Sequence, residues 1–295
     1  MDSALTAVAL PLALALVMFG LGLSLTVGDF GRVGRHPKAV VIALSLQLLV
    51  LPVVCFGLVL TFGLSPVLAV GMLILAASPG GTTANLFSHL FHGDVALNIT
   101  LTAVNSLIAV VTLPIITNLA LGFLEPDIGE GSVGLQLGKT VQVFAIVLVP
   151  VVLGMLVRRS SPGFAARSDK PVRILSAVVL ALVILGTVLA ERENIGAYFS
   201  EVGLPTLLFC LASLGFGFLV PRLLGVVREQ AVASAFEIGV HNGTLAIAVA
   251  ISVLGSVELA VPAAVYSVIM FPTAAVFGWV ISRAASSAAT TTGAS

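Results

Sequence analysis

The chain has 295 residues, of which 59% are hydrophobic and only 9% are charged, and its formal net charge at pH 7 is zero. Soluble domains carry about 25% charged residues, so this chain cannot cover a water-facing surface, and lipid must be its main solvent. The balanced charge gives no sign of nucleic-acid binding. The two cysteines, Cys55 and Cys210, lie in apolar runs, and we expect them to be buried core residues rather than a disulfide.

Long apolar segments follow one another along the whole chain with short connections. A helix needs roughly 20 apolar residues to cross the hydrocarbon layer of a bilayer. Nine segments meet this length: 4–26, 38–62, 66–91, 95–121, 138–157, 172–190, 202–220, 230–254 and 260–282. The sequence therefore predicts an all-α polytopic membrane protein with about nine transmembrane helices, and any function must lie within the membrane bundle.

The basic residues orient these segments. If the loop after the first segment is cytoplasmic, 11 of the 13 Lys and Arg residues fall on the cytoplasmic side, and only Lys139 and Arg192 fall outside. By the positive-inside rule we expect a multi-pass protein of the cell inner (plasma) membrane, with its N-terminus outside and its C-terminus in the cytoplasm. Residues 284–295 are rich in Ala, Ser and Thr, and they are predicted to form a disordered tail.

The third segment is interrupted at mid-membrane depth by Ser78-Pro79-Gly80-Gly81-Thr82-Thr83. Proline lacks an N–H and disfavours helix in the residue before it, and glycine reaches backbone geometries closed to other residues. A second short helix is expected to restart near Thr82, with Asn85 on its first turn. A Pro-Gly break alone is often only a kink, so this motif alone leaves both readings open.

Two other segments carry polar side chains. Asn98, Thr102 and Asn105 in the fourth segment recur at i, i+4 and i+7 and form one polar face, which is expected to look into the bundle. Gln47 in the second segment is less specific, because a single glutamine also serves as a contact between helices.

The eighth segment is interrupted by Glu237-Ile238-Gly239-Val240-His241-Asn242-Gly243. A charged side chain near the bilayer centre costs at least a few kcal/mol, so Glu237 must face a cavity or a partner. Restarted helix N-termini offer positive dipole ends to an anion, and freed carbonyls offer oxygen ligands to a cation. Two interrupted helices in corresponding halves of a chain indicate an inverted-repeat secondary transporter with its binding site where they cross.

Taken together, these motifs resemble the bile acid:sodium symporter family, in the same order and over nearly the whole chain. The matching stretches are Arg35–Lys38, Gln47, Ser78–Asn85, Gly93–Leu97 and Glu237–Ala246. In ten-span bacterial relatives the motif Met-Phe-Gly lies on the second helix, whereas here Met18-Phe19-Gly20 lies on the first segment. By this comparison we expect the chain to lack the family's first helix, as some nine-span animal relatives do.

The resemblance implies a panel domain and a core domain, the core being an inverted repeat with two crossing discontinuous helices. The panel would comprise residues 1–27 and 138–190. The core would comprise residues 38–121, with a broken helix at 78–83, and residues 202–283, with a broken helix at 237–243.

The resemblance also implies two sodium sites behind the crossing. Ligands of the first site fall on Asn85, Asn98, Thr102 and Glu237, and another family ligand, a serine, falls on Ala84, which has no side-chain oxygen. Ligands of the second site fall on Gln47, on Glu237, on the carbonyls of Ile238 and Val240, and on His241, where the family usually has glutamine.

Because imidazole nitrogen is a poor partner for sodium, His241 leads to the hypothesis that the second site is weakened, or that a protonated His241 beside Glu237 replaces the ion. We therefore expect one or two sodium ions and no other metal.

The expected cargo is an organic anion in front of the crossing. The resemblance implies that it meets Thr82, Thr83, Asn242 and Gly243 at the two helix restarts, and Met270 and Phe271 in the last segment, where a bacterial relative is more polar. A small carboxylate such as a 2-hydroxy or 2-oxo acid is the first choice, and a bile-acid-like amphipath is the second.

The predicted function is sodium-coupled symport by alternating access. The alternative is a proton-coupled or uncoupled facilitator that uses His241 and Glu237. An enzyme is not expected, because the sequence has neither an HExxH metal pair nor a nucleophile with an adjacent base. Besides the anion, membrane lipid is the only other partner expected, and the sequence does not indicate an oligomeric state.

Overall fold

Helix is the only regular secondary structure in the part of the chain that the computed structural model describes. That part comprises residues 15–16, 18–20, 22–23, 32–127, 137–168, 170–172, 174–175, 178 and 195–292. The helical elements are η1 (Arg32–Arg35), α3 (Pro37–Ser45), η2 (Leu46–Val50), α4 (Leu51–Phe62), α5 (Pro66–Ala77), α6 (Thr82–Leu90), α7 (Val95–Leu124), α8 (Leu137–Ser160), α10 (Ile195–Leu223), α11 (Arg228–Gly239), α12 (Gly243–Ser252), η3 (Glu258–Ala260) and α13 (Val261–Thr292). The predicted all-α fold class is confirmed for these residues.

Four stretches of helix among the described residues are long and apolar enough to cross a membrane. They are Pro37–Phe62, Val95–Leu124, Gly196–Leu223 and Glu258–Arg283. The shorter apolar helices α5 and α12 are halves of the two interrupted segments. The predicted segments 4–26 and 172–190 lie largely outside the described residues, so the total of nine remains a prediction.

The outer faces of the long helices are apolar and exposed, as lipid contact requires. Exposed Leu, Val and Ile side chains recur at helical spacing on α4, α7, α10 and α13: Val53, Leu60, Val111, Ile115, Leu119, Leu204, Leu211, Leu219, Val268, Val276 and Val280. A water-soluble protein rarely exposes such contiguous apolar surface.

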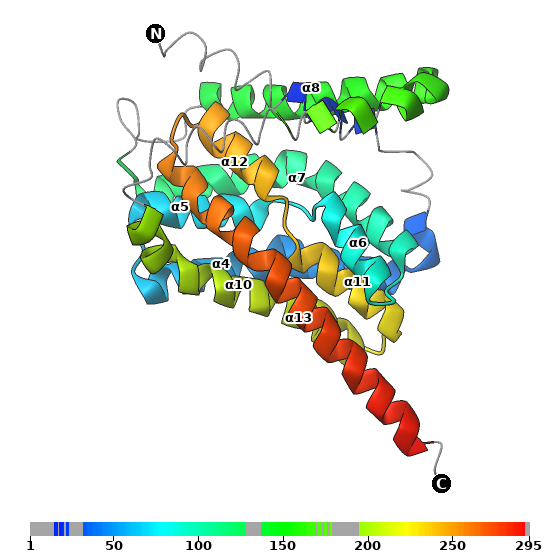
Figure 1. Ribbon diagram of the computed structural model, residues 1–295. Helices are drawn as coiled ribbons and strands as arrows, with labels where there is room; N and C mark the ends of the chain where they lie inside the picture. Colours follow the sequence, from blue (N-terminus) through cyan, green and yellow to red (C-terminus); the bar gives the residue numbers. More distant parts are fainter. Residues whose placement is uncertain are drawn as a thin grey trace.

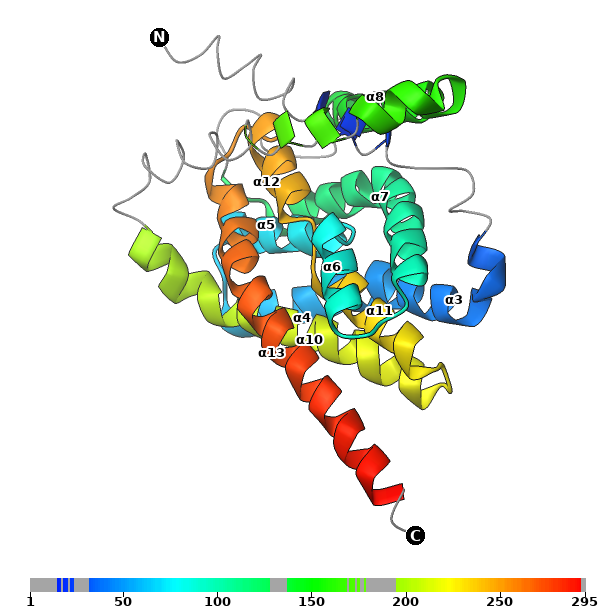
Figure 2. The ribbon, with the colours of Figure 1, turned by 45° about the vertical axis from the view of Figure 1, so that its right-hand side comes forward.

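The two interrupted segments lie at the centre of the bundle. Every residue of α5 from Val67 to Ala77 is buried, and so is every residue of α11 from Ala231 to Gly239. Helices α4, α7, α12 and α13 pack against α5, while α6, α7 and α10 pack against α11 (Figures 1 and 2). The broken backbone is therefore enclosed by protein rather than by lipid, which is the setting in which irregular backbone is tolerated at membrane depth.

Helix α8 lies at one side of this bundle, next to the described pieces of the first segment (Figures 1 and 2). The two backbones touch, because a Cβ on Gly22 would collide with the Val151 carbonyl and one on Gly154 with the Phe19 carbonyl. Glycine at both positions permits this close approach. Among the described helices, α7 is the main neighbour of α8.

Several loops meet at one end of the bundle. The distribution of Lys and Arg residues predicts that all of them lie on the cytoplasmic side of the membrane. Gln230 Nε2 lies 2.8 Å from His36 Nδ1, and the Asp94 N–H donates to the Glu229 carbonyl at 2.8 Å. His36 Nε2 is 4.0 Å from Asp94 Oδ2. Arg228 Nη2 reaches the Ile281 carbonyl at 3.0 Å. These contacts join the starts of α3, α7 and α11 to the second half of α13.

Helix α13 continues to Thr292, whereas the sequence analysis placed a disordered tail over 284–295. Alanine has the highest helix propensity, and the Ala-rich residues after Arg283 carry the helix past the predicted end of the last segment. Both cysteines are buried free thiols, as expected.

Candidate functional site

The breaks in the two central segments are paired with each other. Helix α5 ends at Ala77, and Gly80 forms an antiparallel bridge with His241. The Gly81 N–H donates to the Val240 carbonyl at 2.9 Å, and the Asn242 N–H donates to the Pro79 carbonyl at 2.8 Å. Backbone N–H and carbonyl groups that have no partner within their own helix at one break are thus hydrogen-bonded to the backbone of the other break.

Glycine at position 80 is required by the closeness of this crossing. A Cβ at Gly80 would collide with both the backbone carbonyl and the carboxylate of Glu237. At Gly81 the nearest atoms would lie between 3.4 and 3.7 Å from a Cβ, an ordinary contact distance. The absence of a side chain at Gly80 therefore allows the first break to lie directly against the Glu237 carboxylate of the second break.

Two helices restart at the crossing. Helix α6 begins at Thr82, and α12 begins at Gly243. The Asn242 side chain caps α12, since its Oδ1 accepts from the Leu245 N–H at 3.0 Å. The N-termini of both helices carry positive dipole ends next to the paired breaks, where an anion is favoured.

Of the residues predicted for the first sodium site, Thr102 contacts the buried Glu237 carboxylate directly. Thr102 Oγ1 donates to Glu237 Oε2 at 2.5 Å, and Asn98 Nδ2 donates to the Ala233 carbonyl at 2.8 Å. Among the residues predicted for this site, three buried side-chain oxygens have no hydrogen-bond partner: Glu237 Oε1, Asn98 Oδ1 and Asn85 Oδ1. Carboxylate and amide oxygens are the ligands that hard cations take, so this donor set fits a sodium ion.

Residues predicted for the second site are arranged differently. Gln47 Nε2 donates to the carbonyls of Ala76 at 3.2 Å and Ser78 at 3.0 Å. His241 Nδ1 lies 3.1 Å from the same Ser78 carbonyl. Ser78 O therefore faces two N–H donors, and the Val240 carbonyl accepts from Gly81. Ile238 is buried in the last turn of α11.

The continuous helical stretch of α3, η2 and α4 bulges at Gln47. The Leu51 N–H reaches back five residues to the Leu46 carbonyl, so η2 is a π-helical turn. Pro52 explains it in part, because its missing N–H leaves the Leu48 carbonyl without the usual partner. Such bulges are frequent at functional sites, and this one carries the Gln47 amide to the C-terminus of α5.

Aromatic rings enclose His241. Its ring stacks on Phe209 with centroids 5.3 Å apart and meets the edge of Tyr266 at 5.5 Å. Nε2 of His241 is buried without a hydrogen-bond partner, and no ion pair within 4.0 Å joins His241 to Glu237, both of which the structure describes. Tyr266 also donates to the Gly239 carbonyl at 2.9 Å. The sequence analysis did not single out Phe209 or Tyr266, since an aromatic residue in an apolar segment carries no distinctive signal.

Residues predicted to meet the anion come from three helices. Thr82 and Thr83 lie in the first turn of α6, and Asn242 and Gly243 lie at the start of α12. Gly243 packs against Ser267 of α13, because a Cβ there would collide with the serine hydroxyl.

The last predicted pair lies one turn further along α13. Met270 is buried, whereas Phe271 is partly exposed and stacks on Phe87 of α6 with ring centroids 6.3 Å apart. The predicted substrate positions therefore gather around α6, the start of α12 and the middle of α13.

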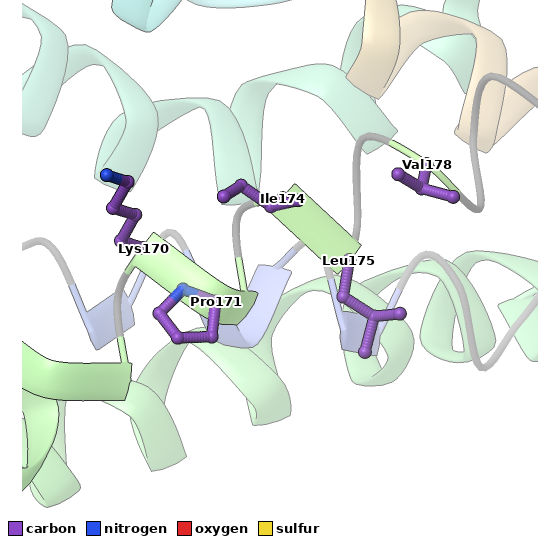
Figure 3. A pocket seen from close by; sticks show the side chains of 5 residues that line it. All are labelled: Lys170, Pro171, Ile174, Leu175 and Val178. Carbon is purple, nitrogen blue, oxygen red and sulfur yellow. The ribbon is translucent and has the colours of Figure 1, made fainter.

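Two cavities lie away from the ion positions. A small one of about 10 Å³ is lined by Met18, by Leu245 and by α7 residues that include Ser106, Val110 and Leu113. A larger one of about 470 Å³ is lined by Lys170, Pro171, Ile174, Leu175 and Val178, side chains of one short stretch of the chain (Figure 3). The larger cavity includes none of the predicted site residues and is mostly apolar, as a lipid-facing groove would be.

Comparison with known proteins identifies the family to which the chain belongs. The family model described as Sodium Bile acid symporter family matches residues 11–198, more than half of the chain. The sodium-dependent transporter YocS of Bacillus subtilis (strain 168) is 30% identical over 261 residues, which cover 86% of this chain and 77% of that protein.

Two eukaryotic relatives extend the comparison. The ileal sodium/bile acid cotransporter of Homo sapiens is 27% identical over 237 residues, covering 80% of this chain and 67% of the relative. The probable chloroplastic sodium/metabolite cotransporter BASS2 of Oryza sativa subsp. japonica is 26% identical over 257 residues, or 87% of this chain, which spans only 60% of that protein. The family and these relatives are sodium-dependent transporters and not enzymes, and the chain belongs to the sodium bile acid symporter family.

Proposed function

We propose that the chain is a secondary active symporter in which a sodium ion at Glu237 promotes binding of an organic anion at the crossing. The observation that carries this proposal is the set of buried, unpartnered oxygens of Glu237, Asn85 and Asn98. A buried carboxylate without a compensating charge is costly, and a bound cation removes that cost. Thr102 holds the other carboxylate oxygen and thereby orients the group.

The anion would bind at the restarted ends of α6 and α12. Thr82, Thr83, Asn242 and Gly243 offer backbone N–H groups and positive dipole ends there. Sodium and anion couple because each stabilises the same arrangement of the two breaks, which are joined by backbone hydrogen bonds. The exposed ring of Phe271 and the buried Met270 give the approach to this place an apolar wall.

A small carboxylate is the first choice for the cargo, and a bile-acid-like amphipath is the second. The helix ends recognise only the charged group, so both share this part of the site. The apolar wall at Met270 and Phe271 and the exposed Leu86 and Leu90 of α6 supply contacts for the remainder of either molecule.

Alternating access would take place between two domains. Residues 1–27 and 138–190 form the panel, which moves against the core made of residues 38–121 and 202–283. The close packing of α8 on Phe19, Gly22 and Leu23 supports this division. The protein would lie in the cell inner membrane with its N-terminus outside, so that the inward sodium gradient drives uptake.

One sodium ion per cycle is the stoichiometry that the site supports best. Of the ligands predicted for the second site, Gln47 keeps an unpartnered Oε1, but the Val240 carbonyl already accepts from the Gly81 N–H, and His241 turns Nδ1 toward the Ser78 carbonyl and offers no oxygen. The second site is therefore weakened. Replacement of that ion by a proton on His241 receives no support from an ion pair with Glu237.

Uptake into proteoliposomes tests the proposal. Small carboxylates and amphipathic organic anions are offered with an inward sodium gradient or an equal potassium gradient. We expect at least one anion to accumulate with sodium only. Equal uptake in sodium-free buffer would favour the alternative, a proton-coupled or uncoupled facilitator that uses His241 and Glu237. No sodium-driven uptake of any anion of either class would contradict the symporter assignment.

A further inference from the structure

Asn105 is a buried amide to which the site described above gives no role. Its side chain is 1% exposed, its polar contact is with the Glu237 carboxylate, and its Oδ1 has no hydrogen-bond partner. The nearby Asn98 differs, because its Nδ2 is bonded to the Ala233 carbonyl. A buried amide oxygen with no partner is destabilising, and such a group is usually retained for a reason other than packing.

The direction of α7 places Asn105 at the ion position. Asn98 bonds to residue 233 and Thr102 bonds to residue 237, so α7 and α11 run side by side in the same direction. Asn105 comes one turn after Thr102 on the same face of α7. Its amide lies beside the Glu237 carboxylate, close to the point where α11 ends at Gly239.

We infer that Asn105 Oδ1 is a further oxygen ligand of the sodium ion at Glu237, an inference that rests on the proposed function. Glu237 Oε1, Asn98 Oδ1 and Asn85 Oδ1 provide three unpartnered oxygens, and Ala84 at the adjacent position provides no side-chain oxygen. Hard cations take about six or more oxygen ligands. The Asn105 amide adds one from α7, so the ion draws α7 toward both breaks.

Ser106 provides a matched comparison. It is as buried as Asn105, and its hydroxyl also lacks a partner. However, its side chain lines the small cavity with Met18 and Leu245 rather than the carboxylate. The two adjacent residues thus separate an effect on the ion from a general effect of removing a buried polar group from α7.

The test measures cation-dependent thermal stabilisation of the purified full chain in detergent. Wild type, Asn105→Leu, Asn105→Ala and Ser106→Ala are titrated with sodium and with lithium against a potassium baseline. Leucine retains the side-chain volume and alanine avoids overpacking, so at least one of the two Asn105 variants is expected to fold.

We expect both Asn105 variants to need about tenfold more sodium for half-maximal stabilisation, the scale of one lost interaction with a charged partner. We also expect them to alter the ratio of lithium to sodium affinity, because a lost ligand changes the size of the cage. Ser106→Ala should match wild type in both respects.

Sodium affinity within twofold of wild type in the folded Asn105 variants would overturn this inference and leave the proposed function intact. An equal loss of affinity in Ser106→Ala would also overturn it, since the effect would then be structural. If wild type itself shows no stabilisation by sodium over potassium, the proposed function fails first, and the inference fails with it.

Discussion

Glu237 is the single residue on which the account of this transporter depends most. It is 1% exposed in the last turn of α11, with one carboxylate oxygen held by Thr102 and the other without a partner. Burial of an unpaired carboxylate costs several kcal/mol, roughly as much as a protein domain's whole margin of stability. A cation that shares the site, as proposed above, would remove this cost.

His241 makes the sharpest prediction at the residue scale. His241→Gln can keep an N–H for the Ser78 carbonyl while adding an amide oxygen, which sodium prefers. We expect the Hill coefficient for sodium in uptake to rise from about one in wild type toward two in the variant. Sodium titration of uptake at several pH values measures it.

The pH series also separates the two hypotheses for His241. Because Nδ1 of His241 faces the Ser78 carbonyl and its Nε2 has no partner, rather than either nitrogen facing Glu237, we expect similar pH profiles in wild type and variant. A pH dependence that disappears in His241→Gln would instead support replacement of the second ion by a proton. An unchanged Hill coefficient would contradict the weakened second site.

At the scale of elements, the crossing depends on the close approach of two backbones. Gly80→Ala introduces a methyl group that collides with the Glu237 carbonyl and carboxylate, whereas Gly81→Ala meets ordinary contact distances. Overpacking of this kind costs about 1–3 kcal/mol. We expect Gly80→Ala to lower the melting temperature and remove sodium-dependent stabilisation, and Gly81→Ala to lower the melting temperature much less.

Thermal melts of the two purified alanine variants with and without sodium provide the measurement. If Gly80→Ala retained the sodium response of wild type, the first break could not lie against the carboxylate as described. The reverse order of effects, with Gly81→Ala the more damaging, would also be incompatible with the geometry of the crossing.

The two helix breaks were predictable from the sequence because Pro79, Gly80 and the polar run around Glu237 have direct backbone and burial consequences. The burial of α11 was less predictable from the sequence. Only the helices that pack against it reveal that Ala231–Gly239 is enclosed on all sides. The contacts of His241 with Phe209 and Tyr266 depend on which helices pack together, and no local pattern encodes this. The continuation of α13 past Arg283 follows from the high helix propensity of alanine, whereas the Ala-, Ser- and Thr-rich composition suggested a disordered tail.

At the scale of the whole molecule, transport requires the proposed panel to move against the core. Met18 of the first segment and Leu113 of α7 line one cavity, so a flexible thiol cross-linker can tether Met18→Cys to Leu113→Cys across the boundary. Ser65 belongs to the proposed core, and Glu201, whose Oε1 lies 3.3 Å from the Ser65 N–H, directly precedes the core's second part on the same helix, α10. The pair Ser65→Cys and Glu201→Cys is therefore the matched control.

We expect cross-linking across the boundary to abolish sodium-driven uptake and cross-linking within the core to leave most of it, with reduction of a cleavable linker restoring transport. Uptake in proteoliposomes before and after reduction measures both. Full activity of the boundary tether would contradict movement of the panel against the core at this place.

We propose that a sodium ion bound at Glu237 couples transport to the sodium gradient, and the decisive measurement is the sodium dependence of thermal stability in wild type and Glu237→Gln. A ligand that binds only the folded state at a hundredfold excess over its Kd adds about 2.7 kcal/mol of stability. The account predicts a saturable stabilisation of wild type by sodium and not by potassium. It predicts no sodium response in Glu237→Gln, with stability in potassium at least equal to wild type because the uncompensated charge is gone. Equal stabilisation of both proteins by sodium would contradict the claim.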